Sequence, residues 1–159
     1  MQSYPIFVYG TLMRGERAHQ LLVADSTRWC KALLPAAQLY LSPGGYPLAA
    51  EQVGDGAQPI GGVWGEVHWL RPSGYAALLL RLDQYEGDEY MRLLRKVVLP
   101  IEAGKIVQSA QTLSTEPTTA TALSSTLTTW VYLSETNYAS QHTLLASGDW
   151  RKRAHDAHR

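Results

Sequence analysis

The sequence predicts an α+β domain built on a mixed sheet or small barrel, with two or three helices packed outside. Candidate strands outnumber candidate helices, and no βαβ alternation runs through the chain, as a parallel α/β sheet would require. Of the 159 residues 45% are hydrophobic, which is enough for one substantial core. This length is typical of a single domain, which we place at residues 1–150, followed by a polar, basic, flexible tail at residues 151–159.

The first half of the chain begins with a short strand at residues 6–9, which is apolar on both faces as expected for a central buried strand. Gly10 ends this strand. A short helix is expected within residues 16–24. Residues 29–41 are expected to form one or two strands, closed by the turn at residues 42–45.

A strand at residues 63–70 opens the second half, with Glu66 and His68 on one face and small or apolar residues on the other. Pro72 opens the clearest helix, and Gly87 ends it as a left-handed C-terminal cap. The apolar stripe of this helix, at helical spacing, consists of Leu78, Leu79, Leu82 and Tyr85.

The last third of the chain is predicted to contain two more strands, at residues 92–101 and 130–133. Between them, the Thr-, Ser- and Ala-rich residues 103–129 are divided between an exposed hairpin and its loop. A helix through residues 142–145 is expected after the last strand.

Composition gives no reason to propose a nucleic-acid or membrane partner. Lys plus Arg and Asp plus Glu both count 14, and no basic residues interleave with the aromatic ones, so we expect no nucleic acid as partner. No apolar run approaches the ~20 residues that cross a bilayer, and the start lacks a signal peptide, so we expect no membrane association. Cys30 is the sole cysteine, which suits a reducing cytoplasm. A monomer is the default expectation.

Tyr9-Gly10-Thr11-Leu12 is the first candidate site, because an apolar strand here runs straight into a glycine. Glycine permits a close backbone approach, and consecutive N–H groups in such a turn can converge on a carboxylate or an oxyanion. An ordinary strand-to-loop turn is the alternative, because strands often end in glycine.

Glu86 is the second candidate, in the last turn of the expected helix and to one side of the core-facing residues Leu82 and Tyr85. A carboxylate there meets the negative end of the helix dipole, and partial burial among aromatic residues would raise its pKa. Both effects would make Glu86 a better general base near neutral pH. The alternative is that the acidic residues around Glu86 form only a solvated surface.

Together, these two segments resemble the gamma-glutamylcyclotransferase-like family. The resemblance spans most of residues 5–150, and its pieces follow the family's order and spacing. Its main carriers are residues 8–12 and residues 82–87 followed by Tyr90 and Arg92. Shorter similar pieces lie at residues 45–47, 62–68 and 147–150.

The resemblance implies a compact β-barrel that holds a cleft, with Glu86 as the catalytic acid/base. It also implies that the tetrapeptide binds the glutamyl end of a substrate through backbone groups, while tyrosines line the pocket. The implied substrate-binding residues are Tyr9, Gly10, Thr11, Leu12, Tyr46, Tyr90 and Tyr138. Two departures concern substrate choice more than chemistry: Ala18 stands where members often have Asn, and residues 103–129 look longer than usual.

The implied reaction converts a small-molecule γ-glutamyl amine or dipeptide to 5-oxoproline and a free amine. The substrate's α-amine attacks its own γ-carbonyl, so the enzyme needs to hold the folded conformer and move a proton. No cofactor and no metal are expected. The alternative is a non-catalytic small-molecule binding or interaction module on the same fold, although mere binding of an anionic glutamyl group would not need Glu86.

Other signals are weaker. Cys30 is expected to be a buried structural thiol, and the sequence lacks the Gly-x-Ser-x-Gly elbow of serine hydrolases. His155 and His158 have adequate spacing for a metal, but they lie in the tail without cysteine partners. Glu66 and His68 are the best rival acid/base pair, although a structural pair is the favoured interpretation.

Overall fold

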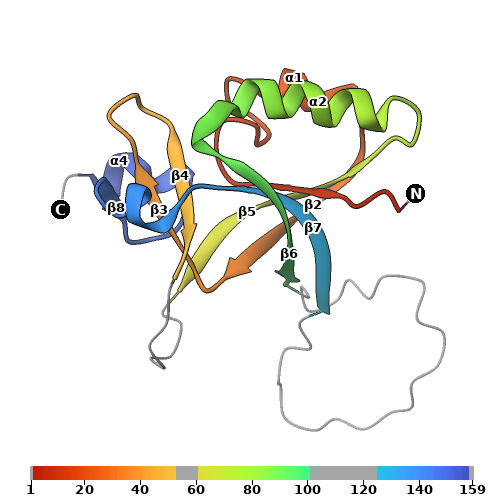
Figure 1. Ribbon diagram of the computed structural model, residues 1–159. Helices are drawn as coiled ribbons and strands as arrows, with labels where there is room; N and C mark the ends of the chain where they lie inside the picture. The colour runs from red at the N-terminus through yellow and green to blue at the C-terminus, as the bar shows by residue number, and fades with distance from the viewer. Residues whose placement is uncertain (1, 53–60, 101–124, 158–159) are drawn as a thin grey trace, which may run out of the picture.

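A computed structural model of the protein describes residues 2–52, 61–100 and 125–157. These residues form a closed five-stranded barrel, a smaller second sheet and several short helices (Figure 1). The predicted α+β class with a compact mixed barrel and flanking helices is therefore confirmed. Most of the predicted hairpin and loop at residues 103–129 lies outside the described residues.

The barrel is mixed because β1 pairs antiparallel with β5 but parallel with β7, while every other neighbouring pair is antiparallel. Ile6 of β1 lies opposite both His68 and Trp130. All three residues of β1 are at most 3% exposed, as predicted for a central strand. In barrel order, the strands are β1 (Ile6–Val8), β5 (Gly62–Leu70), β2 (Ser26–Pro35), β6 (Met91–Leu99) and β7 (Ser125–Leu133).

The second sheet has the order β4 (Pro47–Glu51), β3 (Ala37–Leu41) and β8 (Thr143–Leu145). The predicted helix through residues 142–145 is wrong, because Leu144 and Leu145 pair with β3 in an antiparallel ladder. A short apolar run fits a helix or a strand equally well, and here the open edge of β3 decides between them.

In the described residues, four α-helices and two 3₁₀ turns flank the sheets. The main helix begins three residues after Pro72, and Gly87, with φ 73°, follows its last residue. Within the described chain no helix is both long and apolar enough to span a bilayer. The helices are α1 (Gln20–Val23), α2 (Tyr75–Glu86), α3 (Thr136–Ala139) and α4 (Arg153–Asp156), and the 3₁₀ turns are η1 (Gly87–Glu89) and η2 (Trp150–Lys152).

The predicted apolar stripe of α2 is correct for its three leucines and wrong for Tyr85. Leu78, Leu79 and Leu82 are buried, whereas Tyr85 is 40% exposed. A tyrosine can keep its hydroxyl at a polar partner while its ring packs, and the Tyr85 hydroxyl here contacts Thr11. Tyr85 thus connects the helix to the loop after β1 instead of filling the core.

One large apolar core joins the barrel interior to the helices. Leu22 of α1 and Leu82 of α2 belong to the same buried cluster as Phe7 of β1 and Val67 of β5. Figure 1 shows α1 and α2 on the same side of the barrel. This packing fixes the C-terminal end of α2, and with it Glu86, relative to the end of β1.

Basic side chains stack on tryptophan rings at several positions. The Arg14 guanidinium carbon lies 4.1 Å from the ring centroid of Trp29, and Lys31 Nζ lies 4.8 Å from that of Trp64. The expectation that basic residues do not interleave with the aromatic ones is therefore wrong, because arginine and lysine side chains lie over several tryptophan rings. The absence of a nucleic-acid partner stays a prediction.

Candidate active site

The tetrapeptide follows β1 and turns its side chains into the protein. Tyr9, Thr11 and Leu12 are 6%, 9% and 3% exposed, and the Tyr9 hydroxyl donates a hydrogen bond of 2.5 Å to the carbonyl oxygen of Tyr132. A Cβ at Gly10 would lie 2.2 Å from the Cγ of Pro47, so glycine alone fits this approach. The backbone of the tetrapeptide is therefore the part left for a ligand.

The N–H groups of this loop are available for hydrogen bonding. In the described part of the chain, no protein group accepts a hydrogen bond from the backbone nitrogens of Gly10, Thr11 or Leu12. Two carbonyl oxygens of the loop do accept hydrogen bonds within the chain. Met13 N–H donates to the Gly10 oxygen at 3.0 Å, and Ala18 N–H donates to the Thr11 oxygen at 2.9 Å. Such unpartnered donors can hold a carboxylate or an oxyanion.

Glu86 is the last residue of α2, partly buried where the chain turns into η1. Burial raises the pKa of its carboxyl from the ordinary 4.5 to about 7. Among the described residues, no cation pairs with this carboxylate and no hydrogen bond reaches it. A carboxylate with a pKa near 7 can take up a proton and return it at neutral pH.

A direct contact joins the two candidate segments, although 74 residues separate its partners. Thr11 Oγ1 and the Tyr85 hydroxyl are 2.8 Å apart. One cavity of about 460 Å³ is lined by Gly10, Thr11 and Leu12 and also by Glu86. The structure thus brings the tetrapeptide and the carboxylate to the same cavity. Its tyrosine and charged lining residues are Tyr9, Arg17, Tyr46, Tyr85, Glu86, Asp88, Glu89, Tyr90 and Tyr132.

Of the three other tyrosines predicted to bind substrate, two line the cavity and one does not. Tyr46 and Tyr90 line the cavity, and the Tyr90 hydroxyl donates to the carbonyl oxygen of Pro47. Tyr138 is not among the lining residues described, but its hydroxyl donates to Glu89 Oε1 at 3.3 Å, and Glu89 lines the cavity. The substrate-binding role of each predicted residue stays a prediction.

Sequence reasoning missed Arg17 and Tyr132. Arg17 is exposed and lines the cavity from the loop that follows the tetrapeptide, so its charge five residues after Leu12 was a usable signal. Tyr132 lines the cavity from β7, and its hydroxyl donates to Asp83 Oδ1 at 2.7 Å. The pairing of β7 with β1 and β6 places Tyr132 there, and the sequence does not reveal the pairing with β1.

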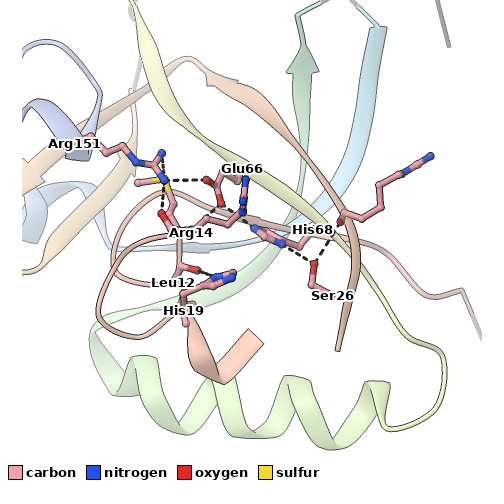
Figure 2. A network of polar contacts seen from close by, with 9 residues as sticks. Leu12, Arg14, His19, Ser26, Glu66, His68 and Arg151 are labelled. Carbon is pink, nitrogen blue, oxygen red and sulfur yellow. Dashed lines mark hydrogen bonds and ion pairs between the residues drawn. The ribbon is translucent and has the colours of Figure 1, made fainter. Parts of the chain in front are cut away.

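The rival pair Glu66 and His68 forms a closed polar network (Figure 2). Glu66 is 3% exposed and His68 1% exposed, and His68 Nε2 lies 3.0 Å from Glu66 Oε2. Arg14 N–H donates to the same oxygen at 3.0 Å, and Arg151 Nη2 donates to Glu66 Oε1 at 2.9 Å. Burial opposes ionisation of Glu66, but these hydrogen bonds outweigh it and hold its pKa below the ordinary value. Such a carboxylate suits structure better than proton transfer.

The remaining candidates offer little. Within the described ranges, no group of three or more His, Cys, Asp or Glu side chains could hold a metal ion. His155 lies in α4, and His158 lies outside the described residues. Cys30 is half-buried, and burial raises the pKa of its thiol, which disfavours the thiolate needed of a nucleophile.

The end of the chain contacts the barrel through Arg151, which lies in η2 and reaches Glu66 of β5. The described tail residues also form α4. The division of the chain at residue 150 stays a prediction.

Fold and site together define a small β-barrel domain with one cavity lined by a carboxylate of raised pKa and by a loop whose N–H groups have no partner in the described parts of the chain. The sequence profile of the gamma-glutamyl cyclotransferase, AIG2-like family matches residues 6–152. The chain therefore belongs to this family, as the sequence resemblance predicted.

Solved structures share the fold. An AIG2-like protein of Mus musculus is similar with a TM-score of 0.57 and 20% identity, over 89% of this chain and 83% of that one. A yeast gamma-glutamyl cyclotransferase specific to glutathione gives 0.53 and 14%, over 83% and 69%. An uncharacterized protein of Pyrococcus horikoshii gives 0.58 and 17%, over 98% and 97%. At these identities the likeness shows the fold alone. A search of curated proteins finds no significant match.

Proposed function

We propose that the protein is an enzyme that converts a γ-glutamyl amine or dipeptide to 5-oxoproline and a free amine, with Glu86 as general acid/base. The observation that carries this proposal is that Glu86, with a pKa near 7, and residues 10–12 line one cavity of about 460 Å³. That volume suits a small molecule. Membership of the gamma-glutamyl cyclotransferase family supports the same reaction.

In the proposed reaction, the Glu86 carboxylate takes a proton from the substrate's α-ammonium group. The neutral amine then attacks the γ-carbonyl carbon and closes a five-membered ring, and the carbonyl oxygen becomes an oxyanion. As the oxyanion re-forms the carbonyl and the C–N bond to the leaving amine breaks, protonated Glu86 gives its proton to the leaving nitrogen. The ring nitrogen then loses its second proton to the regenerated Glu86 carboxylate or to solvent, which leaves the neutral lactam. The α-amino group has an ordinary pKa of about 8, so transfer to a carboxyl of pKa near 7 is almost balanced.

The N–H groups of residues 10–12 stabilise either the oxyanion or the substrate's α-carboxylate in this scheme. Preorganised donors of this kind stabilise developing charge without reorganisation. Because nucleophile and electrophile belong to one molecule, holding the folded conformer supplies much of the acceleration, with effective molarities of ~10⁵–10⁸ M.

The test is an assay of 5-oxoproline release from a wide panel of γ-glutamyl amines and dipeptides, run with a chelator present. We expect at least one substrate to give product in proportion to enzyme concentration. If folded protein binds 5-oxoproline but releases none from any substrate, the non-catalytic binding module is the correct alternative.

A further inference from the structure

Glu66 and Arg151 meet at the loop that follows the tetrapeptide, and they fix one residue of it from two directions. Glu66 Oε2 accepts from the backbone N–H of Arg14, while Arg151 Nη2 donates to the carbonyl oxygen of Arg14 at 2.7 Å. The ion pair between Arg151 Nη2 and Glu66 Oε1, at 2.9 Å, closes the ring of contacts. Both backbone polar groups of Arg14 are thereby held by one ion pair.

The anchor of these contacts is rigid. Glu66 lies in the middle of β5, opposite Val8 of β1 on one side and Lys31 of β2 on the other. His68 Nε2 contacts its carboxylate, and His68 Nδ1 lies 2.8 Å from Ser26 Oγ (Figure 2). A carboxylate fixed within a barrel and satisfied on both oxygens holds its partners in one geometry.

The loop between this anchor and the cavity is short. Arg14 is only two residues beyond Leu12, the last predicted donor to the substrate. Arg151 Nη1 also approaches Met13 Sδ at 3.4 Å, and His19 Nδ1 donates to the Leu12 carbonyl oxygen at 2.9 Å. These contacts leave residues 12–14 little freedom to turn their backbone away from the cavity.

We propose that Glu66 and Arg151 are positioning residues, which hold the N–H groups of residues 10–12 toward the cavity through the backbone of Arg14. The C-terminal segment is then a part of the binding site's support, although none of its described residues lines the cavity. The expected effect on kcat/KM rests on the proposed function, whereas the expected effect on the rigidity of the loop does not. The two acidic residues thus differ in role: Glu86 transfers the proton, and Glu66 orients the donors.

Arg151→Met tests the inference, with Lys152→Met as the matched control. Both changes remove one positive charge from η2. Among the described residues no hydrogen bond or ion pair reaches the Lys152 side chain, whereas Arg151 reaches Glu66 and Arg14. Arg151→Lys keeps the charge but loses the planar guanidinium, whose Nη2 donates to both Glu66 and Arg14. The readouts are amide hydrogen exchange of residues 10–16 and kcat/KM for 5-oxoproline release across pH.

We expect Arg151→Met to speed exchange in residues 10–16 at least about tenfold and to lower kcat/KM by about 10- to 100-fold, as small misplacements do. At low pH kcat/KM should rise with pH as Glu86 ionises, and the pH at the midpoint of this acidic limb should be the same in Arg151→Met as in the wild type. Lys152→Met should match the wild type, and Arg151→Lys should fall between the two.

Equal exchange in Arg151→Met and Lys152→Met would overturn the inference, as would faster exchange with unchanged kcat/KM or a displaced acidic limb. If the wild type turns over no γ-glutamyl substrate, the proposed function fails. The exchange comparison still decides in that case whether Arg151 and Glu66 hold the loop.

Discussion

Two carboxylates flank the loop after β1, and burial acts to raise the pKa of both, but they differ in the donors and cations that surround them. Glu66 accepts hydrogen bonds from His68, Arg14 and Arg151, and its pKa is lowered. Glu86 has no cation or donor among the described residues, and burial raises its pKa to about 7. Glu66, whose burial is offset by hydrogen bonds and a cation, suits a structural role. Glu86, whose burial is not offset, is the better proton carrier.

The comparison also predicts opposite effects on stability. For Glu66, whose folded pKa is lowered, the stabilisation is present above the unfolded pKa of about 4.5 and is lost as the pH falls. For Glu86, whose folded pKa is raised, the contribution is complete below pH 4.5 and is lost as the pH rises through about 7. At neutral pH the fold therefore retains Glu86 at a cost in stability, which is common for functional residues.

The largest expected effect is that of Glu86→Gln on turnover. Glutamine keeps the size of the side chain but cannot accept the proton, so kcat should fall by about 10²- to 10⁴-fold. The free energy of unfolding at pH 7 should not decrease, because no partner of Glu86 is lost. Steady-state assays of 5-oxoproline release and thermal unfolding measure the two quantities. Retained turnover in this variant, with turnover lost in Glu66→Gln, would reverse the roles.

Glu66→Gln should show the converse pattern, with its main effect on stability. Removing one charge of a buried pair typically costs about 3–5 kcal/mol, and we expect about 2–3 kcal/mol here because the Arg151 side chain is 44% exposed. Denaturant unfolding at pH 7 and pH 4 measures this cost, which should shrink at the lower pH because the carboxyl, with its higher pKa in the unfolded state, is protonated there first. A cost that is equal at both values would contradict the assignment of Glu66 as an ionised anchor.

How far the sequence predicts this site depends on how local each signal is. The buried strand before Gly10 and the helix that places Glu86 at its last turn are local patterns, and both are present in the structure. Tyr85, Tyr132 and the Arg151 contact depend on pairings between distant segments. Periodicity alone predicts Tyr85 in the core and a helix at residues 142–145. Tertiary contacts instead leave Tyr85 partly exposed and place Leu144 and Leu145 in a strand.

The smallest expected effects concern tyrosines at the cavity. Tyr138→Phe should change kcat/KM by less than about threefold, because Tyr138 is exposed and reaches the cavity only through Glu89. Tyr90→Phe should lower it by about five- to tenfold, since it removes a hydrogen bond to the Pro47 oxygen, worth about 1 kcal/mol. Kinetics of the two variants side by side measure this difference. A larger loss in Tyr138→Phe would mean that this tyrosine touches the substrate directly.

The pH dependence of kcat/KM for 5-oxoproline release tests the central claim most directly. Glu86 must be ionised in the free enzyme to accept the substrate's proton, so kcat/KM should rise tenfold per pH unit below the pKa of Glu86 and level off above it. The account predicts a midpoint for this acidic limb at about pH 7, and no such limb in the residual activity of Glu86→Gln. A midpoint near 4.5, or an unchanged limb in Glu86→Gln, would contradict the claim that this carboxyl is the general base.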